Sequence, residues 1–297
     1  MKTIHFIVNP IAGKGKPRIT KHYLSAFFEK DDFTIVVKHS DYKGHATLLV
    51  QQSISENAEI IVACGGDGTI NEVASCLVNS RILLGIIPLG SGNGLARNLK
   101  IPKDLKKAIQ LIIDQKVTPI DVGSINGEYF FSNIGFGFAA NTISNFESTS
   151  KRRLITYLRA TLQSVRSFKN DTEYTIEING KAAILNPFLV FVSNTNIMGY
   201  NFSMTRKAIL NDGLLDIVII DRLNKSKILY LAFLFLLRCE HKIKEYSYQK
   251  VENVTMKIEN KDTELIFEKD GELRRTNPVV FHLEVLKESL NVIAALD

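Results

Sequence analysis

The stretch IIVACGGDGTINEV, residues 60–73, places a continuous apolar run directly before a glycine-rich turn and the start of a helical pattern. Apolar runs without alternating polar residues are typical of strands that are covered on both faces. The same order of run, turn and helix recurs over roughly the first 120 residues. Strands are predicted at residues 4–8, 33–38, 60–64 and 82–87, and helices at 19–29, 46–53 and 69–78. This alternation predicts a doubly wound α/β domain with a parallel sheet, in which ligands bind beyond the carboxyl ends of the strands.

After Asp121 the pattern changes to short strands and tight turns. Asn126-Gly127 and Asn179-Gly180 are typical of two-residue hairpin turns and are flanked by strand-like segments. Strands are predicted at 129–132, 175–178, 182–185, 188–193, 215–220, 251–258, 264–268 and 279–285, and helices at about 151–168 and 225–239. We therefore expect a second, mostly antiparallel β domain. The domain boundary is placed near residue 125, which divides the chain into residues 1–125 and 126–297.

Composition narrows the class of protein. The 297 residues are 45% hydrophobic and 23% charged, which excludes a disordered or collagen-like chain and fits about two domains. Cys64, Cys76 and Cys239 are scattered and form no C-x-x-C pair, which argues against disulfides and a cysteine zinc site and favours a reducing cytosol. The start has no small-residue cleavage site typical of a signal peptide. The formal net charge of +6 lacks the clustered basic and aromatic residues typical of nucleic-acid binding, so we expect no nucleic-acid partner.

Three glycine-rich loops follow predicted strands of the first domain, and they span residues 9–16, 65–72 and 88–97. The first is not a Walker A loop and the third does not match G-x-G-x-x-G. Backbone N–H groups in such loops can bind phosphate oxygens, and the helix beginning near Thr69 adds unpaired N–H groups. Asp67 inside such a loop is explained by a Mg²⁺ ion held between carboxylate and phosphate. The alternative is that Asp67 and Thr69 only cap the helix.

A fourth signal, Asp270-Gly271-Glu272, is a tight turn late in the β domain. GGDGT followed by Ile-Asn-Glu, the NPxAGxGK opening, PLGSGN and this DGE turn resemble, in that order, the diacylglycerol kinase catalytic family. That family includes bacterial lipid kinases, sphingosine kinases and ceramide kinases. The resemblance covers essentially the whole chain and implies an α/β nucleotide-binding domain, a C-terminal β-sandwich for the lipid substrate, and an active site between them. It also implies transfer of phosphate from ATP, with Mg²⁺, to a lipid hydroxyl.

The resemblance also implies roles for particular residues. Glu272 matches the general base with Asp270 beside it, and Asp67 and Asp121 would complete an acidic cluster that holds Mg²⁺ and water. A second, structural Mg²⁺ site would use the Asp212 carboxylate and the carbonyl groups of Ile209 and Leu214. The residues expected to bind nucleotide are Asn9, Gly13, Lys14, Ser40, Gly65, Gly66, Asp67, Gly68, Thr69, Ile70, Asn71 and Ser91.

Two features leave the substrate open. Many bacterial members have aspartate where this chain has Gly94, and GSGNGLA is closer to the sphingosine kinase spelling. The acceptor can therefore be diacylglycerol or a sphingosine-like lipid. The alternatives are a soluble kinase for NAD or a sugar phosphate, and a non-catalytic lipid- or nucleotide-binding relative. A serine hydrolase is disfavoured because no G-x-S-x-G elbow exists and His39-Ser40-Asp41 are adjacent.

A lipid kinase without a spanning segment has to reach its substrate from the membrane surface. Residues 228–237 are apolar on every helical face, which predicts a helix packed inside the second domain, with membrane insertion as the alternative. Lys14, Lys16, Arg18 and Arg97 flank the expected cleft and favour docking driven by charge. We expect a cytoplasmic protein with peripheral membrane contact, and the sequence is compatible with a homodimer.

Overall fold

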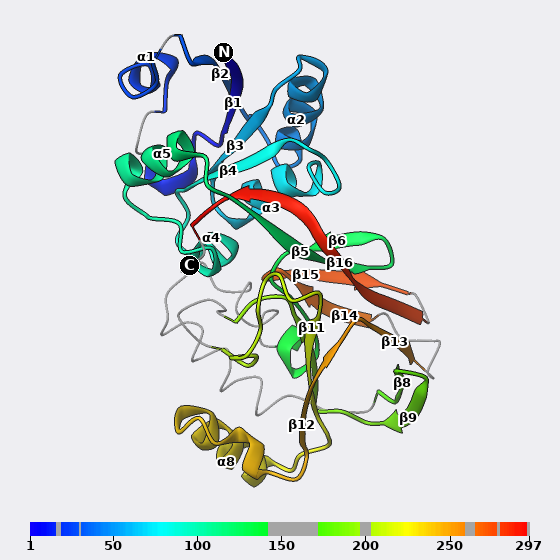
Figure 1. Ribbon diagram of the computed structural model, residues 1–297. Coiled ribbons are helices and arrows are strands. Elements are labelled where there is room, and N and C mark those ends of the chain that lie inside the picture. Colours follow the sequence, from blue (N-terminus) through cyan, green and yellow to red (C-terminus); the bar gives the residue numbers. More distant parts are fainter. Residues whose placement is uncertain are drawn as a thin grey trace.

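Four parallel strands form the first part of a ten-stranded sheet in this computed structural model, in the order β2-β1-β3-β4 (Figure 1). The structure describes residues 1–15, 19–29, 31–141, 172–196, 203–258, 265–277 and 280–295. The strands are β1 (Lys2–Val8), β2 (Phe33–His39), β3 (Ile60–Gly65) and β4 (Leu83–Pro88). All six residues of β3 are buried, as expected for a strand covered on both faces.

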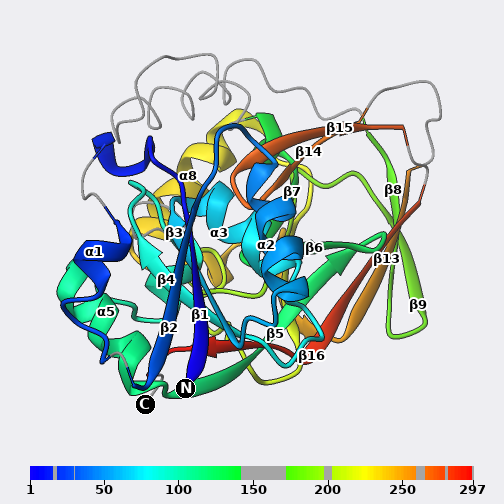
Figure 2. The same ribbon diagram turned by 90° about the horizontal axis from the view of Figure 1, so that it is seen from above.

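Helices cover both faces of these strands (Figure 2). Core clusters place α2 (His45–Ser55), α3 (Asp67–Ser75) and α4 (Gly94–Asn98) on one face. On the other face are α1 (Lys21–Leu24) and α5 (Leu105–Asp114). A short 3-10 helix, η1 (Ala12–Gly15), follows β1. The doubly wound α/β domain is therefore confirmed, although α1 is shorter than the predicted helix at 19–29.

The second half of the chain is mostly antiparallel, as predicted. A six-stranded sheet has the order β12-β11-β10-β7-β14-β15 and packs on the antiparallel part of the ten-stranded sheet through one apolar core. The elements are β5 (Val117–Ile125), β6 (Glu128–Phe130), β7 (Asn133–Gly137), β8 (Tyr174–Ile178), β9 (Lys181–Leu185), β10 (Leu189–Ser193), β11 (Leu215–Ile220), α8 (Lys225–Leu236), η3 (Glu240–Lys242), β12 (Tyr246–Val251), β13 (Asn253–Ile258), β14 (Leu265–Lys269), β15 (Glu272–Thr276) and β16 (Val280–Ile293). The β-sandwich is confirmed, and the helix predicted at 151–168 lies outside the described residues.

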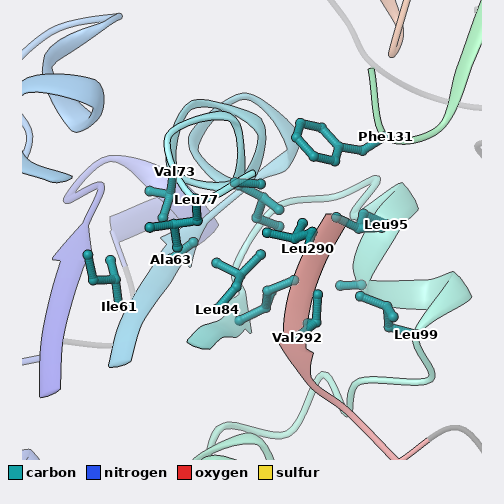
Figure 3. Packing of buried hydrophobic residues seen from close by; sticks show 14 of the residues in the cluster. Ile61, Ala63, Val73, Leu77, Leu84, Leu95, Leu99, Phe131, Leu290 and Val292 are labelled. Carbon is teal, nitrogen blue, oxygen red and sulfur yellow. The ribbon is translucent and has the colours of Figure 1, made fainter. Parts of the chain in front are cut away.

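Strand β16 joins the two halves into one sheet. It pairs antiparallel with β13 and β5 and then, at Val292 and Leu84, parallel with β4. Leu290 and Val292 enter the core formed by α3, α4, β3 and β4 (Figure 3). The strand predicted at 279–285 therefore continues to Ile293, past an irregularity between Leu286 and Leu290. The boundary near residue 125 stays a proposed division of the chain, because the sheet itself is continuous.

Candidate active site

Three glycine-rich loops meet where β1, β3 and β4 end. A Cβ atom on Gly90 would lie 2.7 Å from the Cα atom of Gly66, and one on Gly13 would lie 3.0 Å from the carbonyl oxygen of Leu89. These backbones approach so closely that a larger residue would force them apart. Gly13 also has a φ of 65°, which favours glycine. The loops predicted from the sequence to share one cleft are therefore packed together.

The Asp67 carboxylate connects the second loop to the third. Its Oδ2 accepts a hydrogen bond from the Asn93 backbone N–H at 2.8 Å, and its Oδ1 accepts one from the Gly94 N–H at 2.6 Å. Asp67 lies in the first turn of α3, but the residue that caps α3 is Gly66. The two amides it accepts stand at the start of α4, whose capping residue is Asn93. Asp67 thus fixes the third loop rather than capping its own helix.

Asn9 connects the first loop to the same helix. Its Nδ2 donates to Thr69 Oγ1 at 3.2 Å, and its Oδ1 accepts the backbone N–H of Ile11 at 3.1 Å. Thr69 packs so closely on Gly65 that a Cβ atom there would come within 2.5 Å of the threonine side chain. The first two loops are therefore fixed by side-chain contacts as well as by the sheet.

The remaining residues predicted to bind nucleotide differ in exposure. Ser40 is buried at the end of β2 and its backbone N–H donates to the Val8 carbonyl at 2.9 Å. Ile70 lies in the apolar core, so only its backbone can face a ligand. Ser91 is exposed on the third loop. Lys14 lies in η1, and its side chain is outside the description.

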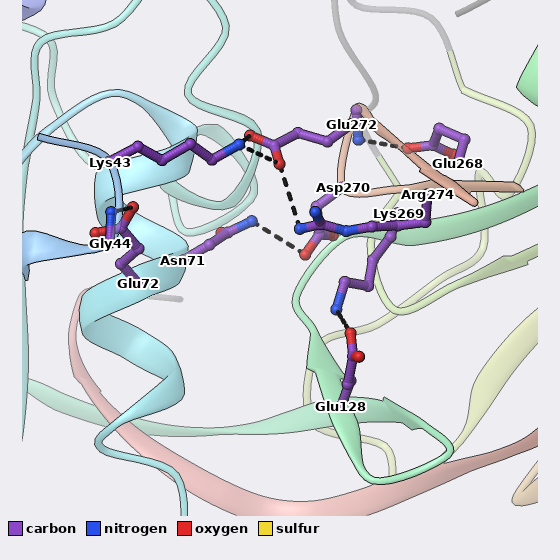
Figure 4. A network of polar contacts seen from close by, with 11 residues as sticks. Lys43, Gly44, Asn71, Glu72, Glu128, Glu268, Lys269, Asp270, Glu272 and Arg274 are labelled. Carbon is purple, nitrogen blue, oxygen red and sulfur yellow. Dashed lines mark hydrogen bonds and ion pairs between the residues drawn. The ribbon is translucent and has the colours of Figure 1, made fainter. Parts of the chain in front are cut away.

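The turn between β14 and β15 brings Glu272 over the second loop. Asp270 and Gly271 adopt positive φ values of 50° and 83°, which is typical of a tight hairpin turn. A Cβ atom on Gly68 would lie 4.0 Å from Glu272 Oε1. The Glu272 carboxylate also pairs with Lys43 at 3.1 Å and with Arg274 at 3.3 Å (Figure 4). An acid from the sandwich thus faces the glycine loop of the α/β layer.

Asp270 has a different environment from its neighbour Glu272. Its carboxylate accepts backbone N–H groups from Phe131, Ser132 and Asn133, the shortest at 2.6 Å from Ser132. It also accepts Nδ2 of Asn71, on α3, at 3.1 Å (Figure 4). Desolvation raises the pKa of Asp270 to about 6, against the lowering effect of these backbone hydrogen bonds. With four donors around it, Asp270 fixes the DGE turn against α3.

Glu268 supports the same turn from below, and sequence reasoning missed it. It is buried, accepts the Asn133 Nδ2 at 2.6 Å and accepts the backbone N–H of Gly271. Burial raises its pKa to about 8, and the nearby Asp270 charge acts in the same direction. No motif marks Glu268, because it reads as one more residue of a strand. Lys43 was also missed, although it directly precedes the Gly44-His45-Ala46 segment.

Asp121 lies at another place in the fold. It is fully buried, and its two carboxylate oxygens accept the backbone N–H groups of Gly213 and Glu288, each at 2.7 Å. Within the described residues, no three His, Cys, Asp or Glu side chains are grouped closely enough to hold a metal ion. The four-carboxylate cluster expected from Asp67, Asp121, Asp270 and Glu272 is therefore not formed, because three of these acids are satisfied by separate sets of backbone amides.

The expected structural Mg²⁺ site is also engaged by other groups. The Asp212 carboxylate forms an ion pair with the Lys250 ammonium, and its Oδ1 accepts the Leu214 backbone N–H at 3.2 Å. The side chain of Ile209 is half-exposed. Since the ammonium already neutralises the single carboxylate, the residues as arranged do not fit a divalent cation, and we derive nothing from a metal there.

The glycine-rich loops of the α/β layer thus face an acidic turn from the β-sandwich, and this two-layer arrangement is the one to compare with known proteins. The family description "Diacylglycerol kinase catalytic domain" matches residues 3–125, and "YegS C-terminal NAD kinase beta sandwich-like domain" matches residues 132–294. A curated diacylglycerol kinase from Bacillus subtilis (strain 168) is 31% identical over 270 residues, covering 88% of each chain. The chain belongs to the diacylglycerol kinase catalytic-domain family.

Solved structures show the same fold. The crystal structure of a diacylglycerol kinase from Bacillus anthracis str. Sterne is 22% identical, covers 99% of this chain and 97% of its own, and has a TM-score of 0.72. Yeast NADH kinase, solved in complex with NADH, is 12% identical, with coverage of 100% and 84% and a TM-score of 0.57. At these identities the likeness concerns the fold alone.

Proposed function

We propose that this protein is an ATP- and Mg²⁺-dependent lipid kinase that transfers the γ-phosphate of ATP to a lipid hydroxyl. The observation that carries the proposal is the position of Glu272 over Gly68, with the three glycine loops beside it. The Bacillus subtilis relative is named a diacylglycerol kinase, so diacylglycerol is the first acceptor to test. We place the reaction in the cytoplasm at the membrane surface.

The loops are suited to the phosphates of ATP. Helix α3 begins at Asp67, and the backbone N–H groups of its first turn, Asp67 to Thr69, have no acceptor inside the helix and can bind phosphate oxygens. In the first loop, Asn9, Ile11 and Ala12 already donate within the fold, which leaves Gly13 and Lys14 for this role. The glycines leave room for phosphate oxygens to approach the backbone. Lys43 pairs with Glu272 and is 76% exposed, so it places an accessible positive charge beside the second loop.

Two side chains at these loops, Asp67 and Asn93, have the type of oxygen atom that binds Mg²⁺. Asp67 retains lone pairs beyond the two amides that it accepts. The buried Oδ1 of Asn93, on the neighbouring loop, has no hydrogen-bond partner among the residues described. Both are oxygen donors, which Mg²⁺ prefers, and the ion binds largely through substrate phosphates and its own waters. When bound, Mg²⁺ would neutralise charge on the transferred phosphoryl group.

Glu272 is the group placed to accept the proton of the lipid hydroxyl. Its side chain is 39% exposed, so a substrate can reach it. Lys43 and Arg274 hold the carboxylate above the second loop, and Asp270 with Glu268 fixes the turn that carries it. Proton acceptance by a positioned carboxylate contributes about 10²–10⁴-fold to such reactions, so positioning of the phosphates supplies the larger part.

The test is a phosphorylation assay with labelled ATP, Mg²⁺ and a panel of acceptors: diacylglycerol and sphingosine in detergent micelles, and NAD in solution. We expect label in diacylglycerol. Glu272→Gln should lower kcat by at least ~10²-fold with little change in KM for ATP. Glu177→Gln, at an exposed site on β8, is the matched control and should retain full activity. Label in NAD, or in no acceptor, would refute the proposal.

A further inference from the structure

Helix α8 covers the outer face of the six-stranded sheet. Its buried side chains, Ile228, Leu231, Leu234 and Phe235, pack in one apolar cluster with residues of β10 and β11. The expected packing inside the second domain is therefore correct for this face only. In Figure 1 the helix lies at the end of the molecule opposite α1 and α2.

The outer face of α8 remains apolar and exposed. Tyr230, Phe233 and Leu237 are 51%, 54% and 55% exposed, and we call them the α8 stripe. Their spacing of three and four residues places them on one side of the helix. Helix α8 packs on the sheet through its other face, so the fold does not require large apolar residues in the α8 stripe. The prediction of complete burial was wrong for this face, because the sheet contacts only one side of the helix.

Basic residues precede and follow the α8 stripe in the chain. Residues 221–245 contain six Lys and Arg residues and three acids. Two of these acids are paired within the fold, Glu240 with Arg206 and Glu245 with Lys227. Four cations are exposed beside the two ends of the helix, and we call them the basic flank: Arg222, Arg238, Lys242 and Lys244.

We propose that the α8 stripe and the basic flank form a docking surface for a bilayer that contains anionic lipids. Aromatic side chains and leucine are favoured where a membrane meets water, and basic side chains bind anionic headgroups. The helix has 12 residues, a length of roughly 18 Å, which is shorter than the hydrocarbon core of a bilayer. No helix in the described part of the chain is long and apolar enough to cross a membrane. The helix therefore lies in the interface plane.

A second copy of the chain is a poorer occupant of this surface. A two-fold contact would place the α8 stripe against itself and would bring two copies of the basic flank together. Their like charges repel, whereas an anionic leaflet attracts both. The role of this surface, which is to bring the enzyme to its lipid substrate, rests on the proposed function. Its existence is tested independently, because binding to vesicles is measured without ATP or turnover.

The first experiment uses the absence of tryptophan from the sequence. Phe233→Trp places a single fluorophore in the α8 stripe, and Ile184→Trp places one on β9, which is also exposed. Vesicles containing about 30% phosphatidylglycerol should shift the emission of the fluorophore at position 233 to the blue, and brominated lipids should quench it. The fluorophore at position 184 should not respond. An unshifted, unquenched signal from position 233 would overturn the proposal.

The second experiment measures sedimentation with the same vesicles. Phe233→Ser combined with Leu237→Ser should weaken vesicle binding by at least about tenfold, while the control Ile184→Ser changes it less than about twofold. Binding of the unmodified protein should fall as salt rises to about 0.5 M. Circular dichroism confirms that each variant is folded. Equal binding by the double variant, or its conversion from a dimer to a monomer, would overturn the proposal.

Activity assays separate this surface from the proposed function. The double variant should phosphorylate a short-chain diacylglycerol in solution as fast as the unmodified protein and should be slow only with vesicle substrate. If the unmodified protein binds vesicles but labels no lipid, the proposed function fails and the docking surface stands. If both substrates are labelled equally well by the double variant, the docking surface fails and the kinase stands.

Discussion

Glu268→Gln should make the protein more stable at alkaline pH. Glu268 is buried below the DGE turn, and desolvation raises its pKa from the usual 4.5 to about 8. An acid whose pKa is higher in the folded state binds more protons there than in the unfolded chain. The free energy of unfolding therefore falls as pH rises from 4.5 to about 8, and it is level above that range.

The magnitude follows from the two pKa values. Each pH unit is worth about 1.4 kcal/mol, so the full shift corresponds to an upper value of about 5 kcal/mol. Glutamine is uncharged and nearly isosteric with the protonated acid. It can still accept the Gly271 N–H, while a rotated Asn133 amide can accept its NH₂ group. We expect equal stability of the two proteins at about pH 4, below the unfolded pKa of 4.5, and a growing advantage of the variant toward about pH 8.5.

Urea unfolding of both proteins at a series of pH values measures this difference directly. Glu128→Gln is the control, because Glu128 is an exposed acid whose pKa is lowered by its hydrogen bond with Lys269. Its difference from the unmodified protein should be constant above about pH 5.5. A Glu268→Gln difference that does not change between about pH 5 and pH 8.5 would show that Glu268 is ionised throughout, contrary to the argument from burial.

Three further variants test the contacts between the loops and the layers. Asp67→Asn should lower kcat by at least ~10²-fold while the melting temperature changes by only a few degrees, since an amide oxygen can keep one of the two backbone donors; near-normal turnover would contradict the role of this loop. Gly92→Ala should reduce kcat/KM and lower the free energy of unfolding by about 1–3 kcal/mol, because the added Cβ atom would lie 2.6 Å from Asp67 Oδ2. Kinetics identical to those of the unmodified protein would count against this close approach. Leu290→Ala should lower the free energy of unfolding by about 2–5 kcal/mol in denaturant titrations, because this side chain is fully buried; a loss below about 1 kcal/mol would mean that β16 is dispensable to the core.

The sequence was informative where local pattern and structure coincide. Apolar runs in the sequence predicted β1 to β4. The glycine-rich loops could be located too, because backbones that approach closely need glycine and so leave a pattern in the sequence. The β-sandwich and the DGE turn were identified as a unit through the family resemblance. An active site between the two domains was expected from that resemblance and not from periodicity, and the contact of Glu272 with Gly68 was found only in the structure.

The sequence was less informative where a residue acts through distant partners. Asp121 was expected in a metal cluster, but its partners are the backbone amides of Gly213 and Glu288, which no local pattern connects to it. The strand predicted at 279–285 stopped before the polar segment Lys287-Glu288-Ser289, whereas β16 passes through this segment to Ile293. An ion pair such as Lys43 with Glu272 depends on tertiary packing alone.

The position of β16 determines when the core of the α/β layer can form during synthesis and folding. The core around Leu84 and Leu99 stays open on one side until Leu290 and Val292 pack into it, and these two residues are synthesised well after Leu99. A nascent chain that carries only the first half therefore exposes an apolar surface beside β4, where the last strand has yet to pair. Contacts between residues far apart in the sequence also form slowly, because closing a long loop costs more entropy than closing a short one. The α/β layer thus becomes complete only after β16 has been synthesised, so the candidate site forms only when the layer that carries Glu272 is also present.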